Sequence, residues 1–162
     1  MISEISENLY RITLPMPFRL RHVHAYALTS GPDVCLFDTG MYMPGAFERL
    51  EKDLQSIGWS VRNITEIYLS HVHTDHCGMT GIIQDESKAR VYLSRKAHLA
   101  HAHFQQGRRL IEQADLFYSR QGVPADDVRA IIEEIEDMRT RIPDFAITGF
   151  VGESEVRTFG GR

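Results

Sequence analysis

The residues best suited to chemistry lie together at 70–78, in the segment Ser-His-Val-His-Thr-Asp-His-Cys-Gly. His71, His73, Asp75 and His76 directly follow an apolar run that reads as a strand. Residues two apart at an extended strand end point to the same side, so His71 and His73 can face one metal ion. Asp75 and His76 lie on the turn into the next helix and can face a second position alongside. Neutral imidazole and carboxylate suit zinc, and also iron or manganese.

Two adjacent positions of this kind favour a paired-metal centre. In such centres the ions lie roughly 3.5–4 Å apart, lower the pKa of a bound water and polarise the bond to be attacked. The alternative is a polar loop whose histidines cap the following helix and contact water. Three imidazoles and a carboxylate packed this closely favour metal binding over capping.

The surrounding pattern predicts the elements that must position this segment. The order of strands and helices indicates a layered α/β (α+β) fold in a single domain. Strands are predicted at 8–14, 23–29, 34–37, 64–69 and 89–93, and helices at 47–57, 75–84, 96–121 and 125–139. The segment 145–151 is predicted to be a loop or an edge strand, and 155–159 the beginning of one more strand.

Composition excludes several classes of function. The chain has 162 residues, 43% of them hydrophobic, and a formal net charge of −4, which argues against a sequence-blind nucleic-acid binder. No run approaches the roughly 20 apolar residues that span a bilayer, so no membrane partner is expected. The acidic start lacks the pattern of a secretion signal, and two cysteines are too few for a disulfide scaffold, so the predicted location is cytoplasmic.

The segments 67–78 and 36–40 (Leu-Phe-Asp-Thr-Gly) resemble the central metal motif and the upstream Asp-Thr-Gly strand end of the metallo-β-lactamase superfamily. The resemblance implies an αββα sandwich and hydrolysis of an ester, thioester, lactone, amide or phosphodiester. It also implies two zinc ions, with His71 and His73 on the first and Asp75 and His76 on the second. Asp75 would be catalytic by orienting the attacking water, and Asp38 would support the ligand loop.

The resemblance covers only the N-terminal portion of that fold. The family's remaining ligands, a histidine, a bridging aspartate and a last histidine, follow a strand like the one beginning near Val156, and none can be assigned here. We therefore expect one incomplete domain over 1–162. Its β-rich metal-motif part is 1–95, a helical insertion occupies 96–142, and 143–162 starts the second half.

The expected function is hydrolysis of a small ester, thioester or lactone by the complete domain, with this chain alone inactive or impaired. Apolar loops at 16–18 and 41–43 favour a small-molecule substrate, with no nucleic acid as partner. The alternatives are a non-catalytic half-domain or subunit needing a second chain, and an iron-dependent oxygenase on the same fold. A homodimer or a complementary chain is expected to cover the sheet, unless the two long helices fold over it.

Overall fold

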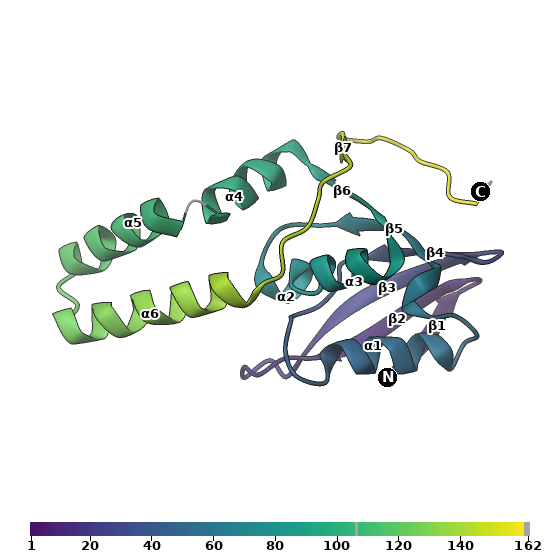
Figure 1. The fold of residues 1–162 in the computed structure, drawn as a ribbon, viewed down its shortest axis with the longest axis horizontal. Coiled ribbons are helices and arrows are strands. Elements are labelled where there is room, and N and C mark those ends of the chain that lie inside the picture. Colours follow the sequence, from purple (N-terminus) through teal and green to yellow (C-terminus); the bar gives the residue numbers. More distant parts are fainter. Residues whose placement is uncertain (106, 161–162) are drawn as a thin grey trace.

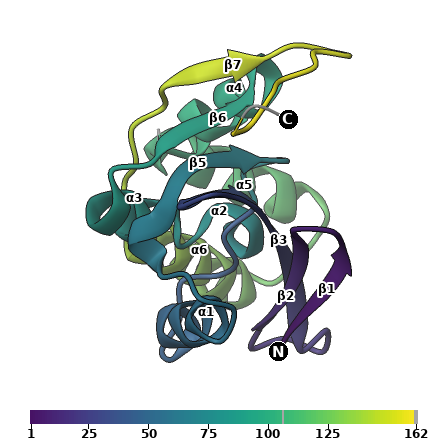
Figure 2. The same ribbon diagram turned by 90° about the vertical axis from the view of Figure 1, so that its right-hand side faces the viewer.

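One sheet of seven strands, arranged in chain order from β1 to β7, forms the centre of the molecule (Figure 2). The structure, a computed structural model, describes residues 1–105 and 107–160. Strands β1 to β4 are antiparallel neighbours, whereas β4 to β7 pair in parallel. The strands are β1 (Ile2–Ser6), β2 (Leu9–Pro15), β3 (His22–Ser30), β4 (Asp33–Phe37), β5 (Ile64–Leu69), β6 (Arg90–Ser94) and β7 (Gly149–Val151).

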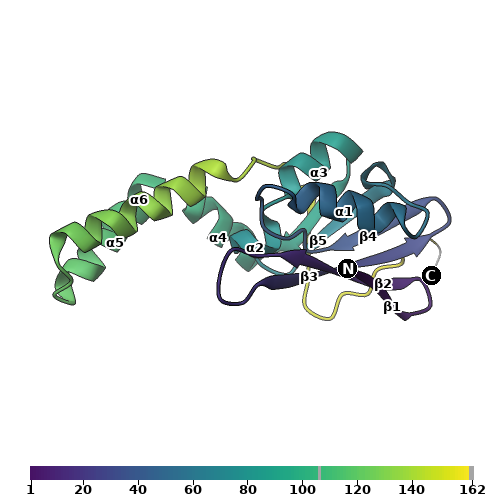
Figure 3. The ribbon, with the colours of Figure 1, turned by 90° about the horizontal axis from the view of Figure 1, so that it is seen from below.

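Helices cover one face of this sheet and extend beyond one end of it (Figure 1). The helix α1 and the short helices α2 and α3 lie on the sheet, while α5 and α6 project away from it as an antiparallel pair (Figure 3). The helices are α1 (Ala46–Gln55), α2 (Thr74–Cys77), α3 (Thr80–Ser87), α4 (Arg95–Gln105), α5 (Gly107–Arg120) and α6 (Ala125–Arg141), with a 3₁₀ turn at Val61–Asn63.

The core fills the space between the sheet and the helices α1 to α3. Alternate strand residues point into it, because side chains along a strand alternate between its two faces. Fully buried examples are Ile12, Leu14, Ala25, Ala27, Val34, Leu36, Ile67, Val91 and Leu93, which meet Leu50, Leu54, Met79 and Ile83 of the helical layer. Burying a side chain of this size contributes roughly 1.5–3 kcal/mol, so this face accounts for much of the hydrophobic stabilisation.

The opposite face of the sheet carries an aromatic row and is not covered by the long helices. Phe37 stacks on Tyr68 at 5.6 Å between ring centroids, and Tyr68 stacks on Tyr92 at 5.1 Å. The segment after β7 returns across this face, where the Arg157 guanidinium lies 4.6 Å from the Tyr92 centroid. The long helices do not fold over this face, so that alternative for covering the sheet is wrong (Figure 3).

Several elements differ from the sequence pattern. The segment predicted as one helix at 96–121 is described as α4 and α5, and only Gly149–Val151 of 145–151 is a strand. Strand β1 was not expected, because most of its side chains are exposed and it is held by backbone pairing to β2. The helix predicted at 75–84 is two helices, broken at Gly78 and Met79. No strand forms at 155–159 in the described chain, because the Glu155 carboxylate accepts the Gly152 N–H and forms a turn.

The segment 96–142, expected to be a helical insertion, contains α4, α5 and α6. Residue 106 lies outside the described residues, as do 161 and 162 at the end of the last expected segment. No helix in the described ranges is long and apolar enough to cross a membrane.

Candidate metal centre

The candidate site forms where two parallel strands end at the same edge of the sheet. Strand β4 is followed by Asp38, and β5 is followed by Ser70 and the histidine segment. The Asp38 N–H donates to the Tyr68 carbonyl at 2.9 Å, which places Asp38 beside the end of β5. Its φ of 57° lies in the left-handed region, which aspartate and asparagine tolerate better than most residues.

The Asp38 carboxylate accepts three hydrogen bonds from the metal loop. Its Oδ1 accepts the Ser70 N–H at 2.8 Å, and its Oδ2 accepts the Ser70 hydroxyl at 2.7 Å. The same Oδ2 lies 2.7 Å from Nδ1 of His76. A carboxylate only accepts, so His76 carries a proton on Nδ1, which leaves Nε2 as the nitrogen of the neutral ring that can bind a metal.

The same reasoning assigns the tautomer of His71. Its Nδ1 lies 2.9 Å from the Ser70 hydroxyl oxygen. That hydroxyl has one proton and gives it to Asp38, so the oxygen must accept the Nδ1–H of His71. His71 therefore also keeps its lone pair on Nε2. One carboxylate thus holds two imidazoles in the form in which Nε2 can bind a metal.

The four predicted ligands lie close together. The ring centroid of His71 is 4.6 Å from that of His73 and 4.1 Å from that of His76. Nε2 of His76 lies 3.5 Å from Oδ2 of Asp75. Burial, reinforced by the neighbouring His76 and His73, lowers the pKa of His71 below its ordinary value and favours the neutral ring.

These side chains gather without converging fully on one point. Within residues 1–105 and 107–160, no three His, Cys, Asp or Glu side chains are already arranged as a group that could hold a metal ion. The chemistry of the donors nevertheless fits zinc, because the set combines three imidazoles with one carboxylate. His71, His73, Asp75 and His76 are the residues that would hold a metal here.

Thr39, which the sequence analysis passed over, fastens the two strand-end loops together. Its N–H donates to the His76 carbonyl at 2.7 Å, and its hydroxyl donates to the same carbonyl at 3.0 Å. The Thr39 side chain is fully buried and also contacts the Thr80 hydroxyl at 3.2 Å. The sequence did contain a signal for this role, because Thr39 lies between Asp38 and Gly40 at the end of an apolar strand. A polar residue that is buried there needs hydrogen-bond partners.

Two glycines let these loops approach closely. A Cβ at Gly78 would lie 2.6 Å from the Tyr42 nitrogen, too close for any side chain. Gly40 has a φ of 83°, and a Cβ there would lie 2.5 Å from Cδ1 of Leu14. The helix α2, which carries Asp75 and His76, is therefore packed backbone to backbone against the loop after β4.

Histidines elsewhere do not join this cluster. On α4, the His98 ring packs on Phe150 at 5.2 Å and the His101 ring on Phe145 at 4.6 Å between centroids. These two histidines therefore hold β7 and the residues that precede it against α4. The two cysteines are free and buried, and Cys77 packs in the core beside the metal loop.

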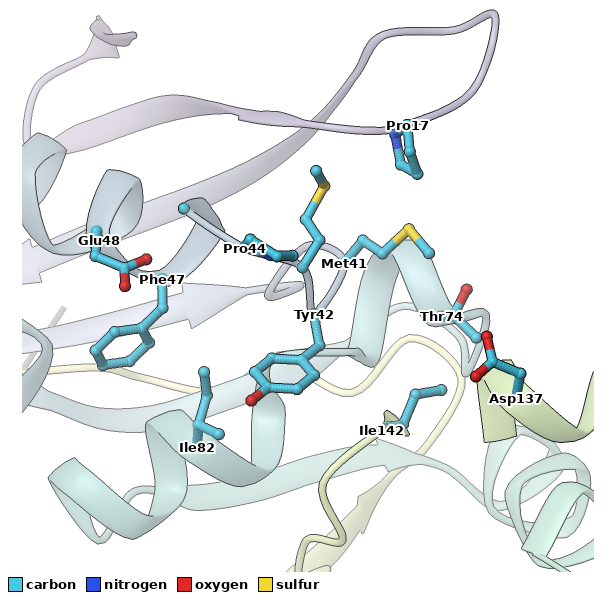
Figure 4. Close-up of a pocket in the computed structure, with 12 residues that line it drawn as sticks. Pro17, Met41, Tyr42, Pro44, Phe47, Glu48, Thr74, Ile82, Asp137 and Ile142 are labelled. Carbon is cyan, nitrogen blue, oxygen red and sulfur yellow. The ribbon is translucent and has the colours of Figure 1, made fainter. Parts of the chain in front are cut away.

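A pocket of about 670 Å³ adjoins the metal loop (Figure 4). Its lining includes Pro17 and the segment 41–45, from the two loops that the sequence indicated as pocket walls. Thr74, which directly precedes Asp75, lines the same pocket. The end of α6 contributes Asp137, and Ile142 follows it, a wall that the sequence analysis did not foresee.

Comparisons with known proteins agree with this arrangement. The structure is similar to that of a metallo-beta-lactamase family protein from Thermus thermophilus, with a TM-score of 0.83 and 24% identity, over 97% of this chain and 50% of that one. Among curated sequences, the chain is 30% identical over 81 residues to "Probable metallo-hydrolase YqjP" of Bacillus subtilis (strain 168), covering 50% of this chain and 25% of that protein. It is 34% identical over 90 residues to Ribonuclease Z of Nocardia farcinica (strain IFM 10152), covering 55% of this chain and 26% of that enzyme.

The chain thus spans about a quarter of the length of these curated relatives and half of the Thermus protein. The family model described as the metallo-beta-lactamase superfamily matches residues 19–154, which include both strand-end loops and all of the helices α4 to α6. The likeness to the Thermus structure extends over the same partial sandwich of sheet and helices. The chain therefore belongs to the metallo-beta-lactamase superfamily.

Proposed function

We propose that this chain carries half of the metal site of a hydrolase that acts on a small ester, thioester or lactone. The observation that carries the proposal is the Asp38 carboxylate, which accepts the Nδ1–H of His76 and holds His71 through the Ser70 hydroxyl. Nε2 is then the nitrogen that each neutral ring offers to a metal. Proteins of this superfamily typically bind metal ions, often zinc, and a bound zinc would supply a water of lowered pKa.

Each residue of the cluster has a role in this proposal. His71 and His73 hold a first ion, and Asp75 and His76 a second; iron or manganese could replace zinc at either. Asp75, 3.5 Å from Nε2 of His76, orients the attacking water through its carboxylate. Asp38 does not touch substrate and acts by positioning the two imidazoles.

The substrate class follows from the surroundings of the site. The pocket beside the loop is mostly apolar and carries the carboxylates of Glu48 and Asp137. Such a lining suits an uncharged organic substrate and disfavours a polyanion such as RNA, the substrate class named for the Nocardia relative. We propose no nucleic-acid partner, and a cytoplasmic location that agrees with two free cysteines.

This chain alone is expected to be inactive or impaired as a catalyst. Its four ligands leave the metal under-coordinated, which weakens binding and leaves the water poorly oriented. A second copy or a complementary chain is proposed to complete the site and to cover the aromatic row of Phe37, Tyr68 and Tyr92. A half-domain with no catalytic role and an iron-dependent oxygenase remain the competing functions.

Metal binding and slow hydrolysis test the proposal together. Zinc stoichiometry is measured by equilibrium dialysis, and hydrolysis of phenyl thioacetate and γ-nonalactone is followed with and without zinc. We expect the chain to bind zinc and to show a slow, zinc-dependent rate of hydrolysis. Both should be lost in His73→Ala and retained in the matched control His22→Ala, a substitution on β3.

Each competing function has its own outcome in this experiment. Zinc binding without zinc-dependent hydrolysis supports the non-catalytic half-domain, whereas oxygen consumption that depends on added iron supports the oxygenase. Hydrolysis at enzyme-like rates would contradict the expected impairment, and zinc binding unchanged by His73→Ala would contradict the ligand assignment.

A further inference from the structure

The pocket beside the metal loop is built like a ligand site. Its volume of about 670 Å³ lies within the range of roughly 300–1,000 Å³ typical of small-molecule sites. We propose that it binds the uncharged, apolar acyl part of the substrate, with Phe47 and Glu48 at the end that limits chain length and the end of α6 supplying one wall. The inference rests on the proposed hydrolase function, whose substrate class it narrows.

Flexible apolar side chains line the middle of the pocket. Met41 and Met43 come from the loop after β4, Phe47 from α1 and Ile82 from α3. In Figure 4, the Tyr42 ring lies between Met41 and Ile82. Unbranched methionine side chains adapt to ligands of irregular shape. The lining therefore suits an alkyl or aryl group and offers few polar partners to a sugar or phosphate.

The pocket has a defined direction relative to the metal loop. Thr74 and Asp137 lie side by side at one end, whereas Glu48 and Phe47 lie at the other (Figure 4). Thr74 begins α2 and directly precedes Asp75 in the sequence, so this end of the pocket is the one nearer the metal loop. The scissile carbonyl is thus placed at the Thr74 end, and the apolar chain points toward Phe47.

Glu48 makes the far end unsuitable for an anion. Its carboxylate lines the pocket, and Arg49, the next residue, is engaged with Asp53 at 2.8 Å. A negatively charged chain terminus would be repelled here by the Glu48 carboxylate. The Arg49 guanidinium would not offset that repulsion, because it is paired with Asp53. The pocket therefore favours neutral chains over dicarboxylic or phosphorylated ones.

One wall near the Thr74 end belongs to the helical segment that projects from the sheet. Asp137 lies on α6, and Ile142 directly follows that helix. In Figure 4, Ile142 lies between the Tyr42 ring and Asp137. The end of α6 and the residue after it thus line the proposed substrate pocket, which assigns this part of the insertion a role in specificity.

Binding to the metal-free chain tests the pocket separately from catalysis. Isothermal titration calorimetry compares three probes: octanamide, propanamide and suberamate, the monoamide of octanedioic acid, which carries a carboxylate at its chain terminus. We expect octanamide to bind at least tenfold more tightly than propanamide, because only the longer chain fills the apolar lining. Suberamate is expected to bind at least threefold more weakly than octanamide, and Glu48→Gln should narrow that difference in affinity.

Two variants and a matched control locate the binding. Ile142→Asn and Met41→Trp should each weaken octanamide binding at least fivefold, the first by adding polarity and the second by filling space. Leu99→Asn, an exposed leucine on α4 outside the pocket, should leave it unchanged. Circular dichroism checks that each variant is folded; should Ile142→Asn unfold, Met41→Trp carries the test.

The outcomes separate the two proposals. Equal binding of propanamide and octanamide, or octanamide binding unaffected by Met41→Trp, would overturn the pocket assignment. Tight binding of a short oligoribonucleotide in place of octanamide would overturn it in favour of a phosphodiester substrate. A third outcome is that octanamide binds as expected but His73→Ala binds zinc as well as the parent chain does. That result would overturn the metal-site proposal and leave the pocket proposal standing.

Discussion

Replacing Asp38 with asparagine tests the central feature of the candidate metal centre. Asparagine has nearly the same shape and tolerates the left-handed φ of 57° at this position, so the backbone should be preserved. The change removes the charge and replaces one acceptor oxygen with an N–H₂ donor. Three groups donate to Asp38 in the parent chain: the Ser70 N–H, the Ser70 hydroxyl and Nδ1–H of His76. In the asparagine variant, at least one of them faces the N–H₂ group and loses its hydrogen bond.

The expected loss of stability follows from these contacts. A hydrogen bond to a charged group contributes about 1.5–3 kcal/mol. The Asp38 side chain is only 13% exposed, so water compensates little of that loss. Loss of one such bond is expected to lower the free energy of unfolding by about 2 kcal/mol, and hence Tm by about 4–8 °C for a chain of this length.

The expected loss of metal affinity follows from the tautomers. Without the carboxylate at its Nδ1, His76 can place the proton on Nε2 and lose the lone pair that binds metal. His71 can do the same, because the Ser70 hydroxyl no longer has a carboxylate to which it gives its proton. Loss of such a supporting carboxylate typically lowers metal affinity by roughly 10–100-fold. Competition with a chromophoric chelator measures the zinc affinity, and ¹⁵N-detected NMR of the imidazoles reports the tautomers directly.

The matched control is Asp85→Asn, an exposed carboxylate on α3. It should change neither Tm nor zinc affinity. The reasoning is refuted if Asp38→Asn keeps the Nδ1–H tautomer in both rings and binds zinc within twofold of the parent chain.

Three further predictions concern the surroundings of the site. Gly78→Ala should destabilise the fold by about 2–4 kcal/mol in urea titrations, because its Cβ would meet the backbone of the loop after β4; an unchanged midpoint would contradict that close approach. Burial raises the pKa of both Cys35 and Cys77 to about 12, so at pH 8 their labelling by iodoacetamide should be about a thousandfold slower than in the urea-unfolded chain. Burial also lowers the pKa of His101 below its model-peptide value of 6.5, so its contribution to stability is present above pH 6.5 and is lost as the pH falls toward the folded-state pKa. Unfolding at pH 7.5 and 5.5 should show this acid sensitivity, and His101→Phe, which keeps the packing on Phe145, should reduce it.

Much of the fold was predictable from local pattern. The strands β2 to β6 show apolar alternation or short apolar runs bounded by turn residues, and α1 shows apolar residues at helical spacing. Strand β1 escaped prediction because its side chains are mostly exposed, and its pairing with β2 is made by the backbone. The break at Gly78 was equally hidden, since a glycine in a helical conformation carries no local signal for the loop that packs on it.

The sequence by itself determined which side chains could bind a metal. The spacing of His71, His73, Asp75 and His76 at a strand end places them together through local geometry alone, because neighbouring positions cannot move far apart. The Asp-Thr-Gly strand end likewise indicated Asp38 as a supporting residue.

Only the tertiary structure decided how these groups are held and what lies beside them. Parallel pairing of β4 with β5 brings Asp38 against Ser70, and that contact fixes the tautomers of two imidazoles. The pocket depends on the return of α6 to the loop after β4, two segments about a hundred residues apart along the chain. Such contacts depend on how layers pack rather than on periodicity, and for that physical reason no local pattern could predict them.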